Sequence, residues 1–249
     1  MTYCLLQPDA SPLPVDALKR AFAAVKGLTE TDGLKAAQET WGILIRNLTR
    51  ETALALQQAL HEHGVSTELV EASQLPRLPD AKCIRRAEIQ PETLVIYDPL
   101  GRAVPVPWGQ VSLIAAGAVR HFSLAKTSTR EWVHDPSVSS SLGLTGAMTW
   151  QTEVRHQFQN QMELLLDLLI GTAAMRFQIE ASNFGFKGVF DRPELDLAGK
   201  VDELIQRLAQ HAPHALLNQG ALAGRDQAST RRLYPSKAAL LDEEIWLLW

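Results

Sequence analysis

Short apolar runs alternate with helically spaced apolar residues over the first 72 residues of the chain. Residues 3–6 form an apolar run of strand length. Pro14 suits a helix start, and beyond it Leu18, Phe22 and Val25 recur at i, i+4 and i+7. This spacing predicts a helix with one buried stripe.

The pattern continues through two more helices and two more strands. Asp32 is placed to cap a short second helix, and residues 42–47 have the composition of a strand. Thr49 is placed to cap a third helix, and Gly64 suits the position just beyond its end. Residues 65–69 alternate apolar with polar side chains, as a half-buried strand does. The predicted order of elements is β-α-α-β-α-β.

This order resembles the C-terminal domain of the bacterial ribosomal stalk protein, as do residues 33–37 and 60–69. In that family the domain docks translation factors through a basic helical face. The resemblance implies the fold and a protein-docking role, and we do not extend it to the ribosome. It makes Lys19, Lys26 and Lys35 candidates for a partner-binding face.

A proline-containing linker at residues 73–81 precedes a β-rich region. Residues 94–119 read as a three-strand meander. Proline has no N–H to donate to a sheet, so Pro105 and Pro107 predict an edge or bulged strand. Trp108 follows them and is a candidate for the rim of a binding surface.

The order of elements predicts the structure of the rest of the β-rich region. Residues 122–160 are expected to be a long loop, because residues 126–150 are rich in Ser, Thr and Gly. A hairpin about Gly171 follows, and then an amphipathic helix through Leu208. Strands followed by a closing helix resemble a pleckstrin-homology-like barrel over residues 82–212. A split into two small β modules around residue 125 is the rival interpretation.

The last segment, residues 213–249, is expected to hold a short amphipathic helix. As a helix it places Leu241, Ile245, Leu248 and Trp249 on one side. Either this segment docks on the protein's own surface, or it anchors a partner, for which Trp is a typical hot-spot residue. The candidate partner-binding residues are Ile245, Trp246, Leu248 and Trp249.

The fold class predicted by these patterns is α+β. It has an N-terminal α/β docking-type module over residues 1–72 and a mainly antiparallel β domain that ends in an amphipathic helix. We expect a bacterial-type cytoplasmic protein, because Cys4 and Cys83 lie far apart in apolar contexts and are expected to be reduced core residues. The apolar run at residues 164–170 is too short to span a bilayer. A net charge of −4 does not favour binding to nucleic acid.

Candidate chemistry is sparse in the sequence. His61 and His63 are two positions apart and do not share a helix face, and no zinc-ligand spacing accompanies them. No nucleophile elbow or phosphate-binding glycine pattern is present. We therefore predict no catalytic, metal-binding or cofactor-binding residues.

The most favoured function is a non-catalytic adaptor or regulatory protein that binds another protein. The alternative is a hydrolase whose site lies under residues 126–150 and uses His121, His134 or His156. An exposed apolar groove or an unpaired strand edge favours the adaptor. A histidine of perturbed pKa in a closed pocket favours the enzyme.

Overall fold

The computed structural model describes residues 1–98, 100–139, 145–228 and 233–249, and it describes residues 121–161 by their backbone alone. The chain divides into two compact units. One unit comprises residues 1–120 and 163–249, and the other comprises residues 121–162. Each unit is described below by itself.

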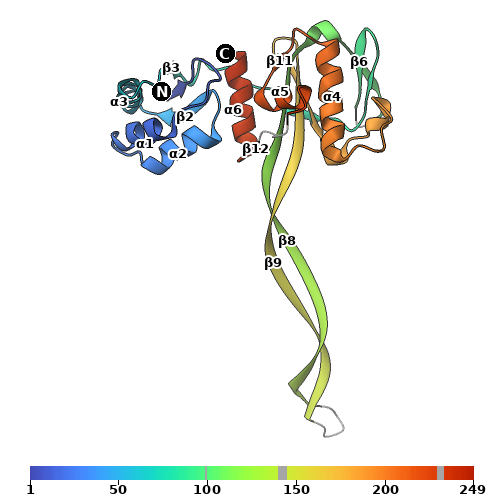
Figure 1. Cartoon of the computed structure of the whole chain (residues 1–249). Coiled ribbons are helices and arrows are strands. Elements are labelled where there is room, and N and C mark those ends of the chain that lie inside the picture. Colours follow the sequence, from blue (N-terminus) through green and yellow to red (C-terminus); the bar gives the residue numbers. More distant parts are fainter. Residues whose placement is uncertain (99, 140–144, 229–232) are drawn as a thin grey trace. The chain divides into compact units, whose positions relative to one another are not determined.

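The N-terminal module has the predicted β-α-α-β-α-β order (Figure 1). Three antiparallel strands form a sheet in the order β2-β1-β3, and three helices pack on it around an apolar core. The elements are β1 (Tyr3–Leu6), α1 (Val15–Ala23), α2 (Glu30–Glu39), β2 (Ile43–Leu48), α3 (Arg50–Glu62) and β3 (Glu68–Glu71).

Side-chain caps set the helix starts in this module. Thr49 accepts a hydrogen bond from the Thr52 N–H and caps α3 as predicted. The cap of α2 is Thr29, whereas the sequence indicated Asp32. Asp32 is instead the third helical residue, and its carboxylate accepts from the Thr29 N–H in a capping box.

The predicted meander is divided between two sheets. Strands β5 (Ala87–Ile89), β6 (Thr93–Tyr97) and β7 (Ala103–Pro107) form an antiparallel sheet in the order β5-β6-β7. Pro105 and Pro107 therefore lie on an edge strand, as predicted. A 3₁₀ turn at Trp108–Gln110 then redirects the chain, so the third strand of the predicted meander joins a different sheet.

That second sheet has six strands, with the path β11-β8-β9-β10-β4 and β12 also paired to β8. Strands β9 and β10 form the predicted hairpin, with Met175 opposite Ile170. None of the described sheets closes on itself, so the pleckstrin-homology-like barrel is not confirmed. The strands are β4 (Ala81–Cys83), β8 (Val111–Ser139), β9 (Thr145–Ile170), β10 (Met175–Glu180), β11 (Leu216–Leu217) and β12 (Leu233–Tyr234).

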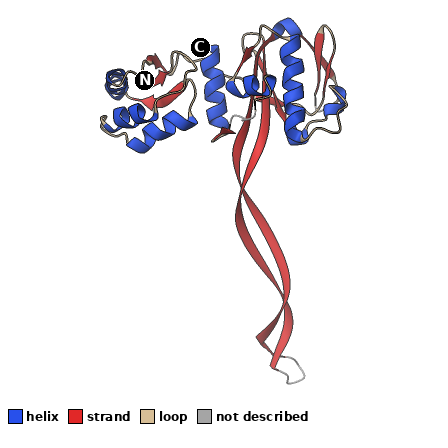
Figure 2. Cartoon of the chain, in the orientation of Figure 1, coloured by secondary structure: helices blue, strands red, loops and turns tan. Residues whose placement is uncertain are grey.

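The long loop predicted at residues 122–160 is wrong wherever the structure describes it. Residues 122–139 belong to β8 and residues 145–160 to β9, and the two strands are paired (Figure 2). The Ser- and Thr-rich composition suggested a loop, but Thr and Val favour extended backbone and alternate there with polar residues. Residues 140–144 lie outside the described residues.

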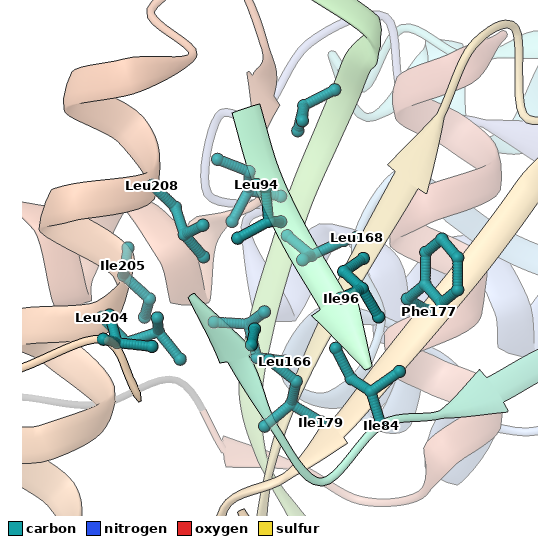
Figure 3. Packing of buried hydrophobic residues seen from close by; sticks show 14 of the residues in the cluster. Ile84, Leu94, Ile96, Leu166, Leu168, Phe177, Ile179, Leu204, Ile205 and Leu208 are labelled. Atoms are coloured by element: carbon teal, nitrogen blue, oxygen red, sulfur yellow. The ribbon is translucent and has the colours of Figure 1, made fainter. Parts of the chain in front are cut away.

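The largest apolar core lies between the six-stranded sheet, the β5-β6-β7 sheet and α4 (Leu197–His211) (Figure 3). The helical stripe predicted in α4 is buried there, for example at Leu204 and Leu208. Two further helices follow, α5 (Gln219–Arg225) and α6 (Lys237–Leu248). In the described part of the chain, no helix combines the length and apolar character needed to cross a membrane.

Asn218 fixes the start of α5 to the backbone of β8. Its Oδ1 accepts from the Ala116 N–H at 2.9 Å and from the Ala221 N–H at 2.8 Å, while its Nδ2 donates to the Ala116 carbonyl at 3.0 Å. Close approach makes these bonds possible, because a Cβ on Gly220 would lie 1.8 Å from the Ala116 carbonyl oxygen. Only glycine fits at this position.

Gly220→Ala tests this close approach. The added methyl group has to push α5 away from β8, and we expect it to lower the free energy of unfolding by about 1–3 kcal/mol. Urea denaturation followed by circular dichroism measures the change. Gly109→Ala is the matched control, because a Cβ there meets nothing within 4 Å, and a change of no more than about 0.5 kcal/mol is expected. Equal stability of the two variants would contradict the proposed contact.

Candidate functional site

Helix α6 packs against the outer side of the N-terminal sheet. Ile245 and Trp246 lie against an apolar cluster that contains Leu6 and Ile43. The Trp246 indole N–H donates to the Gln7 carbonyl at 2.9 Å. Gly42 has a φ of +74°, and a Cβ there would lie 2.1 Å from the Trp246 ring. The indole therefore occupies space that any side chain at position 42 would take.

An ion pair adds to this contact. The Arg46 guanidinium on β2 lies 2.7 Å from the Asp242 carboxylate on α6. Burial raises the pKa of Asp242, and the positive charge of Arg46 partly opposes that shift. Both side chains are more than a quarter exposed, so we assign the pair a positioning role and little net stability.

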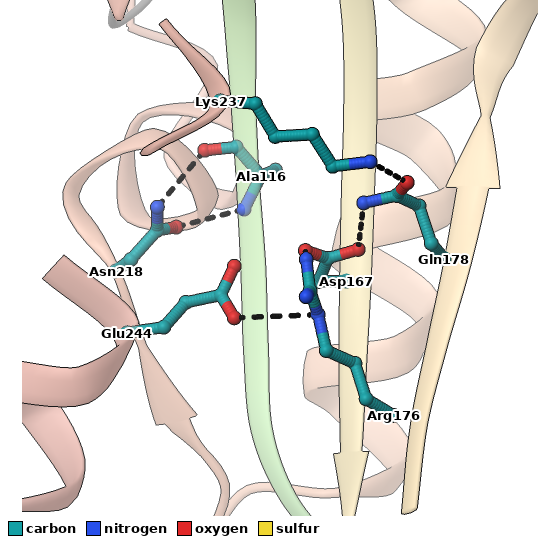
Figure 4. Close-up of polar contacts among 7 residues, drawn as sticks. All are labelled: Ala116, Asp167, Arg176, Gln178, Asn218, Lys237 and Glu244. Atoms are coloured by element: carbon teal, nitrogen blue, oxygen red, sulfur yellow. Dashed lines mark hydrogen bonds and ion pairs between the residues drawn. The ribbon is translucent and has the colours of Figure 1, made fainter. Parts of the chain in front are cut away.

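A buried polar network joins β9, β10 and α6 (Figure 4). Asp167 of β9 is fully buried and accepts two hydrogen bonds from the guanidinium of Arg176 on β10. Asp167 also accepts from the Gln178 side-chain amide at 2.8 Å. The Lys237 ammonium of α6 donates to the Gln178 carbonyl oxygen at 2.5 Å. These bonds hold the ends of Arg176 and Lys237 in place.

Glu244 lies on the other side of Arg176, where its carboxyl is 3.7 Å from the guanidinium. Neither Glu244 oxygen has a hydrogen-bond partner among the described residues. Burial and the negative charge of Asp167 raise the pKa of Glu244 to about 10, against the opposing effect of Arg176. Glu244 is therefore neutral at pH 7, and Asp167 is the carboxylate that pairs with Arg176.

A cleft of about 580 Å³ opens beside this network. We call it the α6 cleft. Its lining includes the apolar side chains of Leu78, Leu241 and Ile245. Four cationic side chains also line it, namely Arg46, Arg77, Arg176 and Lys237.

Strand β4 passes along the cleft and ends the six-stranded sheet on that side. It pairs with β10 in parallel, and just after it the Ile84 N–H donates to the Gln178 carbonyl at 2.9 Å. Successive residues of a strand direct their N–H groups to opposite sides. The N–H groups of Cys83 and Ala81 therefore face the open edge, and Cys83 is exposed.

The exposure of Cys83 corrects the prediction that both cysteines are core residues. Cys4 is buried and Cys83 is exposed, and both are free thiols. Burial raises the pKa of the Cys4 thiol. Cys83 is exposed because β4 is an edge strand, which the sequence did not indicate.

A second hollow, of about 430 Å³, lies at the other end of β4. We call it the Cys83 hollow, and its lining includes Arg85, Arg86 and Tyr97. The Arg86 guanidinium lies 4.2 Å from the centre of the Tyr97 ring and pairs with Glu88 at 2.5 Å. The open edge of β4 thus runs between two hollows that both carry arginine.

The candidate residues of the C-terminal segment differ in exposure. Ile245 and Trp246 are half-buried against the N-terminal module, and Leu248 packs against Leu169 and its neighbours. Trp249 is 46% exposed. The structure thus shows these residues on the protein's own surface, and partner binding by them stays a prediction.

The other candidates are spread over the fold. Trp108 is buried, stacks on His211 with ring centres 4.7 Å apart, and donates to the Gln90 carbonyl. Lys19 pairs with Glu30 at 3.9 Å, and Lys26 and Lys35 are exposed on the N-terminal module. None of these four residues lines the α6 cleft or the Cys83 hollow.

The site suggested for a hydrolase has a different setting from the expected one. His121 and His134 lie in β8, and His156 lies in β9, so they are on strands and not around a loop. Within residues 121–162, the described backbone is two paired strands with no second layer to enclose a pocket. In the described part of the chain, no group of three or more His, Cys, Asp or Glu is arranged to hold a metal ion.

Sequence reasoning missed the network around Arg176. One signal was available, since Asp167 interrupts the apolar run at residues 164–170. A carboxylate inside a buried strand requires a partner. No family model, curated protein or solved structure matches the chain. Its function must therefore be inferred from its own residues.

Glu244→Gln tests the protonated state of Glu244. In the unfolded chain Glu244 ionises near its ordinary value of 4.5, but in the folded chain it holds its proton up to about pH 10. Between these values the folded state binds one proton more, so stability falls as pH rises, by at most about 1.4 kcal/mol per pH unit. Glutamine cannot ionise. The variant should gain stability over the wild type between about pH 6 and pH 9 in urea unfolding experiments.

Glu194→Gln serves as the control, because Glu194 is exposed. Its stability relative to the wild type should stay constant over the same pH range. A constant difference for Glu244→Gln as well would show that Glu244 is ionised in the folded protein.

Proposed function

We propose that the chain is a non-catalytic protein-binding adaptor that adds an extended segment of another protein to the edge of β4. The observation that carries this proposal is the open edge of β4 between the α6 cleft and the Cys83 hollow. In strand addition, main-chain hydrogen bonds supply affinity and pockets for alternate side chains supply specificity. Both components are available here.

The length of the edge supports an added strand. Strand β4 has only three residues, and short edge strands normally limit unwanted pairing. The chain nevertheless stays beside β10 as far as Ile84, whose N–H donates to the Gln178 carbonyl at 2.9 Å. The open edge therefore extends from Ala81 to Ile84, because the Arg86 carbonyl already accepts from the Tyr97 N–H of β6, and four residues are within the usual length of a strand.

The apolar residues that line the α6 cleft support a protein partner over a small polar ligand. Leu78, Leu241 and Ile245 offer an apolar surface next to main-chain donors. An extended peptide presents main-chain acceptors together with side chains, so it uses both features at once. Two free thiols are compatible with a reducing compartment, and we propose that the adaptor acts in the cytoplasm.

Cys83→Pro tests strand addition. Proline removes the outward N–H and leaves the bonds to β10 in place, so an edge strand tolerates it. We expect that ten-residue peptides selected on the wild-type protein from a phage-displayed random library bind the variant about tenfold more weakly or worse. Fluorescence anisotropy with the labelled synthetic peptides measures the affinity.

Cys83→Ala is the matched control, because it removes the thiol and keeps the N–H. It should bind the peptides as the wild type does, and both variants should keep the wild-type melting temperature within a few degrees. Equal binding by Cys83→Pro and the wild type would refute strand addition at β4. Strand addition would also be refuted if no two of the selected peptides competed for binding to the protein.

A further inference from the structure

We infer that the segment added to β4 is acidic and rich in Asp or Glu. This inference rests on the proposed strand addition and specifies the chemistry of the partner. Four cationic side chains lie on β4 or line its two hollows. They are exposed, and none of them has a carboxylate partner among the described residues. They are Arg77, Lys82, Arg85 and Lys237.

Apart from Asp80, the other charged groups at the site are paired or, as Glu244 is, neutral. Arg46 pairs with Asp242, Arg176 with Asp167, and Arg86 with Glu88. In the Cys83 hollow, the carboxylate of Asp98 pairs with Arg102 at 2.6 Å. These pairs leave no net charge. The four unpaired cations therefore determine the sign of the local potential.

A single unpaired carboxylate, that of Asp80, lines the two hollows in the part of the chain that the structure describes. Glu244, behind Arg176, is neutral because burial and Asp167 raise its pKa. The whole chain carries a net charge of −4. The edge of β4 is thus positive on a protein whose overall charge is negative, and it favours an anionic partner over a cationic one.

The unpaired cations lie on the edge strand and beyond both of its ends. Lys82 is on β4, Arg85 lines the Cys83 hollow just after the strand, and Arg77 and Lys237 line the α6 cleft. Opposite charges on neighbouring strands stabilise their pairing, and like charges weaken it. An acidic partner strand has Lys82 beside it and further cations near both of its ends.

The preference is tested with three fluorescein-labelled ten-residue peptides that alternate Thr with Glu, Thr with Gln or Thr with Lys. Fluorescence anisotropy on the full chain should show the Glu peptide binding about tenfold more tightly than the Gln peptide. The Lys peptide should be the weakest. The advantage of the Glu peptide should shrink between about 50 mM and 500 mM salt, because salt screens exposed charges.

Charge reversal locates the effect. Arg77→Glu combined with Arg85→Glu alters two exposed, unpaired side chains, so the fold should be retained, and the variant should now favour the Lys peptide over the Glu peptide. Lys26→Glu combined with Lys35→Glu makes the same change in charge on the N-terminal module and should keep the wild-type order. If only this second pair of substitutions changes the order, the inference is overturned, because the acidic peptide then binds the N-terminal module.

The two proposals fail in different ways. If the Glu and Gln peptides bind equally and Cys83→Pro weakens both, strand addition stands and the acidic preference is refuted. If the Glu peptide binds but is insensitive to Cys83→Pro, strand addition fails, and with it the inference that rests on it. In a third outcome, none of the three peptides binds, but neutral peptides from the library bind and Cys83→Pro weakens their binding. The acidic preference alone is then refuted.

Discussion

The packing of the Trp246 ring on Gly42 is the contact on which the candidate site depends. Helix α6 can approach the N-terminal sheet only because position 42 has no side chain. The indole then bonds to the main chain at Gln7, a residue 239 positions away in sequence. The same helix carries Lys237 and Leu241 into the wall of the cleft. Displacing Trp246 would thus alter the cleft without touching any residue of β4.

Burial of charge behind the cleft constrains what the cleft can recognise. Taking Asp167 and Arg176 out of water costs several kcal/mol per ion, and their mutual hydrogen bonds offset this only with good geometry. Arg176 is therefore committed to Asp167 and is not available to a partner. Glu244 is neutral, so its burial does not require the removal of a charge from water. The cations left for recognition are those at the surface, where desolvation is small.

The sequence predicted local features well and non-local ones poorly. Helical periodicity and Thr49 identified the N-terminal elements, and the two prolines correctly marked β7 as an edge. These signals are contained in a few neighbouring residues. The open edge at Cys83 is a non-local feature, because it depends on β4 lying beside β10 and on the lack of a further paired strand beyond β4 among the described residues. Composition misled at residues 122–139 and 145–160, where Ser and Thr belong to strands.

The separation between the two partners of the Trp246 contact also has a consequence for synthesis of the protein. A chain emerges at about 5–20 residues per second, and domains fold as they appear. Roughly 170 residues separate Leu75, the last cluster member on the N-terminal side, from Trp246, so α6 arrives on the order of 10–30 s later. During that interval the apolar patch around Leu6 and Ile43 is uncovered. Until α6 is complete, the newly made N-terminal module therefore exposes an apolar surface of the kind that favours aggregation.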